Sequence, residues 1–319
     1  RFHLNNPPKD RPCGRMGVNA MKNAKQWKTD VKGLLFILPS LSGFLLFVIV
    51  PVVFSLVISF CKWDYTQGLS GITFNGGVNY LNMWKDDWFL ASFRNTLLFS
   101  VGFVPITLVL ALLISVLMDR YVYNKRSCQL FFFMPYISNV VAVSIVWVIM
   151  LSSSGPITMF IRSLGVENPP KWLGNTSTAL PSIVLMSVWL NVGYLIMIYT
   201  SALQTVPKDL YEAASIDGAN GFKQLWHITI PMLRPTTFFL LITTIINSFK
   251  VFGQVNIMTK GGPGNATSVL VYYIYTSAFS FYDMGYAASM SWVLFILLFG
   301  TVGLSAEFAI GRRARTGTL

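Results

Sequence analysis

The sequence predicts an all-α, polytopic membrane protein with six transmembrane helices. Of its 319 residues, 54% are hydrophobic and only 11% are charged, whereas an average soluble domain carries about 25% charged residues. The apolar residues also gather in runs long enough to cross a hydrocarbon core of about 30 Å, which takes about 20 helical residues. A single soluble core could not hide this much apolar surface.

Six such runs follow one another along the chain. Each is continuously apolar, without the alternation of a β-barrel strand, so each is predicted to be helical. In order they cover residues 34–60, 96–118, 130–151, 180–203, 236–258 and 285–310. The first run is too long for a signal-peptide core and is expected to remain as an anchor. The predicted organisation is an N-terminal tail over 1–33, a transmembrane domain over 34–310 and a C-terminal tail over 311–319.

Basic residues are distributed unevenly between the two sets of connecting loops. With the N-terminus inside, the cytoplasmic Lys and Arg number eight in residues 1–33, three in 119–129, three in 204–235 and three after residue 310. The outward loops hold Lys62, Lys85, Arg162, Lys171 and Lys260. The positive-inside rule therefore predicts that both termini are cytoplasmic, consistent with an even number of spans. Because the net charge of +12 is dispersed at span edges, we expect no nucleic-acid partner.

Residues that could bind a metal or a nucleotide are sparse. In this topology Cys13, Cys61 and Cys128 fall on different sides of the membrane, and so they predict neither a disulfide framework nor a metal site. The phosphate-binding pattern Gly-x4-Gly-Lys-Ser/Thr does not occur. We therefore expect no catalytic residue and no cofactor in this chain.

The connection between the fourth and fifth runs is the most specific part of the sequence. Pro207 suits the first turn of a helix, and Gly218 and Gly221 break that helix. A second short helix over 222–230 is expected to end before Pro231. Two short helices joined by a Gly-Ala-Asn-Gly turn predict a compact cytoplasmic projection. The alternative is an interfacial or re-entrant helix pair.

This connection resembles the EAA loop of the permease subunits of ABC importers. The family pattern is Glu-Ala-Ala, three residues, Gly, nine residues, Ile, one residue, Leu, Pro. The matching residues here are Glu212, Ala213, Ala214, Gly218, Ile228 and Pro231. The one departure is Ile230, which replaces the usual Leu with a residue of the same volume.

The resemblance extends over roughly residues 34–310 and looks like the carbohydrate-uptake branch, which includes maltose, glycerol-3-phosphate and oligosaccharide permeases. Further segments that carry it are Asn79-Tyr80, Asn95-Thr96-Leu97, FFFMPY at 131–136, Trp172-Leu173-Gly174, GGPGNATSVLVYYIY at 261–275 and Gly285-Tyr286-Ala287-Ala288.

The family implies a complex in the cytoplasmic membrane of a bacterium. Its other members would be a second homologous permease, two ATP-binding subunits that hold ATP and Mg²⁺, and an extracytoplasmic solute-binding protein. The EAA helix would dock on an ATP-binding subunit and transmit its closure to the spans. By this resemblance the residues at the joint are Glu212, Ala213, Ala214, Asp217 and Gly218.

Polar side chains inside the apolar runs are costly in lipid and are therefore candidates for a solute path. They are Asn139, Asn191, Asn247, Lys250 and Gln254. Amides beside aromatic rings suit an uncharged, polyhydroxylated solute such as a sugar. The last three recur at i, i+3 and i+7 and are expected to share one helix face. Alternatively, they bind helices of the partner permease, or Lys250 extends toward the interface.

An ion-gradient-driven secondary transporter of a small polar solute is the alternative function. Such transporters usually keep acidic or histidine side chains inside their spans as relays. Here Asp119 and Glu307 lie at span edges, and the two histidines, His3 and His227, lie outside the runs. The sequence therefore favours the importer permease.

Overall fold

The computed structural model describes residues 36–316, without the side chains beyond residue 303. The chain divides into two units, Arg1–Val57 and Ile58–Leu319. The described part of the first is helical and contains the π-helical turn η1 (Leu45–Ile49) and most of α2 (Val50–Ser59). The second is also mostly helical, with one short antiparallel ribbon of β1 (Cys61–Lys62) and β2 (Thr73–Phe74). The predicted helical class is confirmed.

Within the described residues, five helices are long and apolar enough to cross a membrane, and a sixth crossing requires a bent helix pair to count as one span. The five are Phe36–Ser59, Asp87–Tyr121, Thr176–Leu203, Arg234–Met258 and Met284–Gly303. Each overlaps one of the predicted runs.

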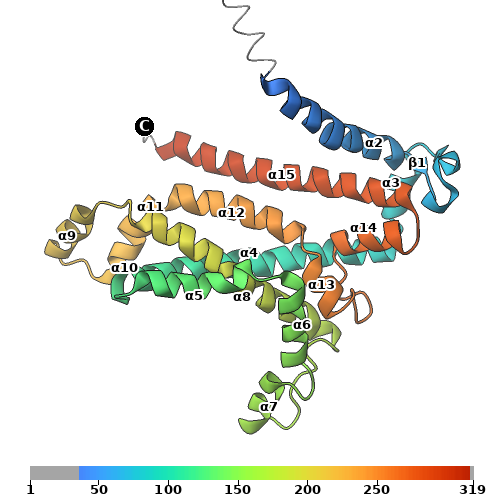
Figure 1. The fold of residues 1–319 in the computed structure, drawn as a ribbon. Helices are drawn as coiled ribbons and strands as arrows, with labels where there is room; N and C mark the ends of the chain where they lie inside the picture. The colour runs from blue at the N-terminus through green and yellow to red at the C-terminus, as the bar shows by residue number, and fades with distance from the viewer. Residues whose placement is uncertain (1–35, 317–319) are drawn as a thin grey trace, which may run out of the picture. The chain divides into compact units, whose positions relative to one another are not determined.

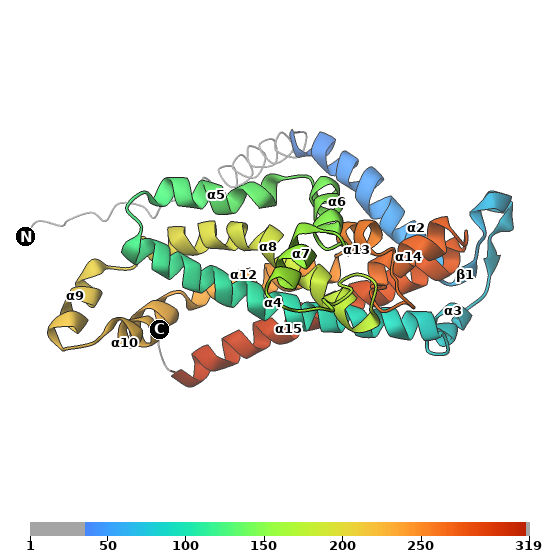
Figure 2. The ribbon, with the colours of Figure 1, turned by 90° about the horizontal axis from the view of Figure 1, so that it is seen from below.

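Four long helices form the body of the second unit: α4 (Asp87–Tyr121), α8 (Thr176–Leu203), α12 (Arg234–Phe249) and α15 (Met284–Thr316). They pack along one another in Figures 1 and 2. The shorter helices are η2 (Tyr65–Gln67), η3 (Leu69–Gly71), α3 (Val78–Met83), α5 (Lys125–Ile137), α6 (Val140–Met150), α7 (Pro156–Ser163), α9 (Lys208–Ile216), α10 (Gly221–Gln224), η4 (Leu225–Thr229), α11 (Ile230–Met232), α13 (Gly253–Met258) and α14 (Leu270–Phe279).

The third predicted run is not one continuous helix. It consists of α5 and α6, which meet at an angle of 94°. The Asn139 carboxamide oxygen accepts a hydrogen bond of 2.8 Å from the Val141 N–H, so this residue caps a new helix at the point where the old one stops. The run predicted over 130–151 is therefore helical but sharply bent at Ser138-Asn139.

The apolar core of the second unit consists of three clusters of buried side chains. The first joins α4, α8 and the segment around α13, the second joins α4, α8 and α12, and the third joins α4, α14 and α15. Fully buried members are Phe99, Ile183 and Val255 in the first, Ala111, Tyr199 and Leu240 in the second, and Phe89, Leu270 and Met290 in the third. Helix α4 contributes to all three clusters. It also contains Pro105, which has no N–H for the helix ladder.

Helices α5 and α8 cross at very short range. A Cβ atom on Gly193 would overlap the backbone carbonyl of Phe132, so only glycine allows this approach. Beside the crossing, Tyr136 of α5 stacks on Tyr194 of α8, with ring centroids 4.9 Å apart. The pair holds the end of α5, just before the 94° bend, against the middle of α8.

One end of α4 is fastened to the segment that precedes α14. The Asn95 amide donates to the carbonyls of Asn265 (2.8 Å) and Ser268 (3.0 Å). The Leu270 N–H donates to the Thr96 hydroxyl at 2.9 Å, which satisfies a backbone group at the start of α14. Two segments that carry the family resemblance are therefore in direct contact, Asn95-Thr96 and the glycine-rich run at 261–268.

Asp86 joins three helices at the same end. One carboxylate oxygen accepts from the backbone of Trp88 and Phe89 and caps α4. The other accepts from the hydroxyls of Tyr273 (2.5 Å) and Tyr286 (2.7 Å), which belong to α14 and α15. Partial burial raises the pKa of Asp86, but these hydrogen bonds outweigh it, and the pKa lies below its usual value.

Gly193→Ala is expected to destabilise the protein by about 1–3 kcal/mol, because the added methyl group forces α5 away from α8. The measurement is the melting temperature of the purified chain in detergent. Gly300→Ala is the matched control, since a Cβ atom there meets nothing within 4 Å. Equal melting temperatures for the two variants would show that α5 does not pack on α8 as described.

Asp86→Asn keeps an oxygen that can cap α4 but removes the negative charge. The lowered pKa means that the carboxylate stabilises the folded state above the unfolded pKa of about 3.9, and that this contribution is lost as the pH falls through the folded pKa. We expect the variant to melt below wild type at pH 7 and the difference to shrink below about pH 4. Asp87→Asn is the control. A difference that stays constant with pH would contradict the role of the charge.

Candidate coupling and translocation sites

Helix α9 carries the Glu-Ala-Ala sequence and is bounded by residues that suit its ends. It begins directly after Pro207, and Asp209 lies in its first turn, where the helix dipole favours an acid. At the other end Gly218 adopts φ +77°, and the Ala219 N–H donates to the Ala214 carbonyl at 2.8 Å. A left-handed residue after the last turn favours glycine. The predicted turn at Gly218 is therefore confirmed.

The second part of this segment differs from the prediction. Asn220 caps α10 by accepting from the Lys223 N–H at 2.9 Å. The helix then widens into the π-turn η4 and continues as α11, with Pro231 in its first turn. The expected stop before Pro231 was wrong. A proline removes one hydrogen bond of the regular ladder, and a π-turn just before it takes up the resulting mismatch.

We call residues 207–230 the coupling segment. In Figure 1 its helix α9 lies at one end of the second unit, beyond the ends of α8 and α12. Glu212 and Ala213 are exposed and Ala214 is half-buried. Among the described residues, the Glu212 carboxylate accepts no hydrogen bond and forms no ion pair.

Large apolar side chains also face outward from the coupling segment. Ile216 is 87% exposed and Phe222 is 68% exposed. Phe222 packs edge-on against Trp226, whose side chain is also exposed, with ring centroids 6.3 Å apart. Exposed apolar groups around an acidic residue form the kind of surface that a protein partner covers.

The coupling segment is tied internally and to α4. The Gln224 amide donates to the Ser215 hydroxyl at 2.9 Å, and the Tyr211 hydroxyl lies 3.0 Å from that of Thr229. Arg120, in the last turn of α4, donates to the side-chain amide oxygen Oε1 of Gln224 at 3.2 Å. The contact between Arg120 and Gln224 was not predicted, because partners 104 residues apart leave no local pattern in a single sequence.

The bend between α5 and α6 gathers several of the predicted path residues. Asn139 lies at the bend and is exposed. It directly precedes Val140, whose side chain would touch a Cβ atom on Gly253, the first residue of α13. Gln254 follows that glycine. Asn139 and Gln254 therefore lie on either side of one close contact between α6 and α13.

Asn191 and Lys250 lie next to the same apolar cluster. The first cluster of the core contains Leu190 and Val251, their sequence neighbours. The Asn191 amide donates to the Ser187 carbonyl at 2.8 Å and its side chain is half-buried, so its oxygen stays available. Asn247 is exposed, and its backbone carbonyl accepts from the Lys250 N–H at 3.2 Å.

The predicted shared face of Asn247, Lys250 and Gln254 is not present. Helix α12 ends at Phe249 and α13 begins at Gly253, with an irregular turn between them. The i, i+3, i+7 spacing describes one face only of an uninterrupted helix, so this prediction was wrong. Among the described residues, none of these three side chains forms a hydrogen bond within the chain.

Aromatic rings are close to the polar residues at the bend. Tyr194 is three residues after Asn191 on α8 and therefore shares its face. Trp189 of α8 lies against Trp147 of α6, with ring centroids 5.7 Å apart. Trp189 and Tyr136 are both partly open to the outside of the chain. Flat aromatic surfaces beside amide groups can bind the apolar faces and hydroxyls of a sugar ring.

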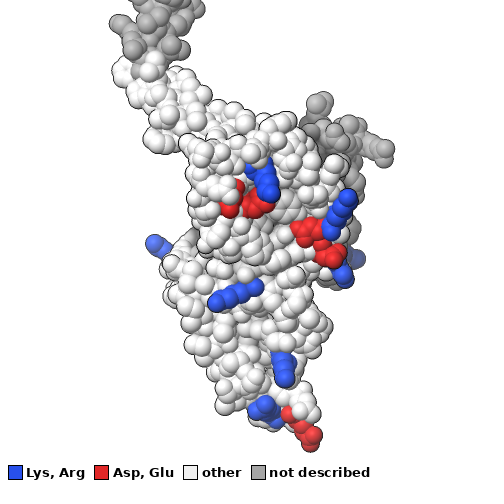
Figure 3. All heavy atoms as spheres, turned by 90° about the vertical axis from the view of Figure 1, so that its right-hand side faces the viewer, with Lys and Arg blue, Asp and Glu red and all other residues white. Residues whose placement is uncertain are grey.

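Charged side chains are sparse at the end of the second unit that carries β1, α3 and α14. On the face shown in Figure 3, Lys and Arg lie singly or beside Asp and Glu on a mostly uncharged surface. The described residues contain one ion pair, between Lys125 and Asp119, at the opposite end of α4. This face therefore offers no concentrated basic patch.

Comparison with known proteins gives consistent matches over most of the chain. Residues 103–316 match the family described as binding-protein-dependent transport system inner membrane component. A probable ABC transporter permease protein of Bacillus subtilis (strain 168), YesP, is 32% identical over 287 residues, which cover 88% of this chain and 92% of YesP. The lactose transport system permease protein LacF of Rhizobium radiobacter is 33% identical over 276 residues, covering 84% and 91% of the two chains.

The fold agrees with a solved structure. A chain from the crystal structure of a bacterial ABC transporter involved in the import of the acidic polysaccharide alginate superposes with a TM-score of 0.77 at 19% identity, covering 90% of this chain and 98% of that one. Since the family match spans more than half of the sequence and the full-length relatives agree with it, this chain belongs to the family of binding-protein-dependent transport system inner membrane components.

Proposed function

We propose that this chain is the permease subunit of an ATP-driven importer of a sugar or oligosaccharide. The observation that carries the proposal is the coupling segment. Its short exposed helix α9 bears the Glu-Ala-Ala sequence and is connected through Gln224 to Arg120 at the end of α4. The sugar specificity is supported by the amides and aromatic rings at the bend, and by relatives whose names give lactose and alginate as their solutes.

In this proposal the chain works with three kinds of protein partner. A second permease completes the translocation path, two ATP-binding subunits hydrolyse ATP with Mg²⁺, and an extracytoplasmic binding protein delivers the solute. Both termini lie in the cytoplasm of a bacterium, and the broken pair of α5 and α6 counts as the third span. This chain itself has no catalytic role.

The coupling segment transmits movement because it has contacts in two directions. Outward, Glu212, Ile216 and Phe222 are free to enter a groove on an ATP-binding subunit. Inward, Gln224 connects the segment to Arg120 of α4. A displacement of α9 therefore reaches α4 through a charge-assisted hydrogen bond and the tightly folded turn at Gly218.

The solute path runs past the bend between α5 and α6. Helix breaks inside a membrane are tolerated where the backbone is buried in protein or lines a cavity, and transporter binding sites are often built around such breaks. Asn139, Asn191 and Gln254 supply amide donors and acceptors there, with Tyr194 and Trp189 as stacking surfaces. An ion-driven carrier is less well supported, because the described parts of the spans contain no buried acidic or histidine side chain.

Glu212→Ala tests the coupling role. We expect the complex purified from native membranes to lose at least about fivefold in ATP-binding-subunit affinity or in solute-stimulated ATPase rate, the effect of losing about 1 kcal/mol at an interface. The fold should survive, since Glu212 has no partner within the described chain. Glu167→Ala, an exposed acid between α7 and α8, is the control. If the chain purifies without ATP-binding subunits and Glu212→Ala changes neither measurement, the ion-driven carrier is favoured.

Gln254→Met tests the solute path with a side chain of similar shape. Loss of one hydrogen bond of about 0.5–1.5 kcal/mol to a sugar hydroxyl should lower uptake by roughly two- to tenfold. Uptake of radiolabelled sugar into reconstituted vesicles, with complex assembly checked in parallel, measures the effect. Gln204→Met, at the far end of α8, is the control. Unchanged uptake would remove α13 from the path.

A further inference from the structure

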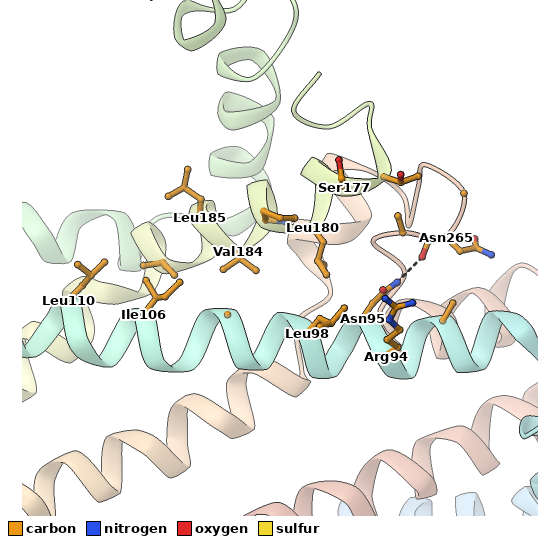
Figure 4. A pocket seen from close by; sticks show the side chains of 17 residues that line it. Arg94, Asn95, Leu98, Ile106, Leu110, Ser177, Leu180, Val184, Leu185 and Asn265 are labelled. Atoms are coloured by element: carbon orange, nitrogen blue, oxygen red, sulfur yellow. Dashed lines mark hydrogen bonds between the residues drawn. The ribbon is translucent and has the colours of Figure 1, made fainter. Parts of the chain in front are cut away.

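An elongated groove of about 910 Å³ between α4 and α8 belongs to neither site described above. Figure 4 shows aliphatic side chains facing it from both helices, among them Leu98 and Ile106 of α4 and Val184 and Leu185 of α8. Gly102 lines its middle. A Cβ atom there would lie in ordinary van der Waals contact with Val184, so the absence of a side chain leaves the groove wider at this point.

The groove has one polar end, and that end is positively charged. Arg94 lies there beside Ser177 and Asn265 (Figure 4). The Arg94 side chain is exposed and, among the described residues, has neither an ion pair nor a hydrogen bond. The first turn of α8 points to the same end and adds the partial positive charge of a helix N-terminus. An anion at this position would therefore meet an uncompensated guanidinium group.

The position of Arg94 along α4 matches a membrane boundary. The next charged residue on this helix is Asp119, and the 24 residues between them are uncharged. At 1.5 Å per residue they span about 36 Å, slightly more than the ~30 Å hydrocarbon core. Arg94 thus lies at the level of lipid headgroups, while the aliphatic part of the groove lies at the level of the acyl chains.

We propose that this groove binds a phospholipid with an anionic headgroup, whose phosphate pairs with Arg94 and whose acyl chains lie along α4 and α8. From Arg94 to Leu110 the groove is about 24 Å long. A slender hydrocarbon chain fits this length.

Selectivity comes from the charge and not from the acyl chains. Bulk lipid tails are as apolar as the groove, so their burial favours no lipid over another. A guanidinium group binds a phosphate through paired, charge-assisted hydrogen bonds. Arg94 therefore selects the headgroup, and the groove fixes its orientation. Neither Arg94 nor the groove takes part in the proposed solute path.

Native mass spectrometry of the full complex, delipidated and titrated with dioleoylphosphatidylglycerol, tests the proposal. We expect Arg94→Gln to weaken the tightest lipid-binding event by about tenfold, the loss of one strong charge-assisted hydrogen bond. Gly102→Leu should abolish it by filling the groove. Arg162→Gln removes an exposed cation on α7, and Gly300→Leu adds bulk where nothing lies within 4 Å, so both should bind as wild type.

Three results would overturn the proposal. Equal binding of phosphatidylglycerol by wild type, Arg94→Gln and Gly102→Leu would show that the groove holds no such lipid. Loss of the second permease from the Gly102→Leu complex, without any loss of lipid from Arg94→Gln, would show that a protein helix covers the groove. Dioleoylphosphatidylcholine carries the same phosphate together with a compensating choline cation, so Arg94→Gln should weaken its binding less than that of phosphatidylglycerol. An equal tenfold loss with both lipids would exclude recognition of a net anionic headgroup.

Discussion

Every N–H and C=O group in an apolar span has to find a partner within the protein, because hydrocarbon supplies none. The long helices meet this constraint along their ladders, and their polar side chains meet it locally. Thr107, Ser115 and Thr200 each donate a hydroxyl to the carbonyl four residues earlier, at 2.6–2.7 Å. Where the ladder stops, side chains take over, as Asn139 does at the start of α6 and Thr96 at the start of α14. The irregular places in this fold are therefore the ones held by specific residues.

The continuous helices could be predicted from the sequence because they depend on composition over a long window. Twenty apolar residues in a row have one stable form in lipid, whatever their order. The end of α9 could also be predicted, since Gly218 acts through its own backbone. In both cases the information lies within a few turns of chain.

The breaks could not be predicted in the same way. Residues 130–151 are apolar on both sides of the bend, and only Ser138-Asn139 carries a helix-start signal. The interruption after Phe249 has no proline to mark it. The helical path that begins as α10 continues through Pro231 in α11 because of a π-turn that hydropathy does not register. The pairing of Asn95 with Ser268 depends on how α4 and the later loop meet in space. These features decide where the candidate path lies.

Helix α4 is held at both of its ends, by Asp86 and Asn95 at one and by Arg120 at the other, and it is about 52 Å long. Halfway along, Pro105 has no N–H, so the helix lacks one backbone hydrogen bond and the Val101 carbonyl lacks its usual donor. A rod clamped at both ends and weakened at its centre flexes at that centre. A force applied at the Arg120 end would then change the angle between the two halves of α4 at Pro105, and would not shift the whole helix along its axis.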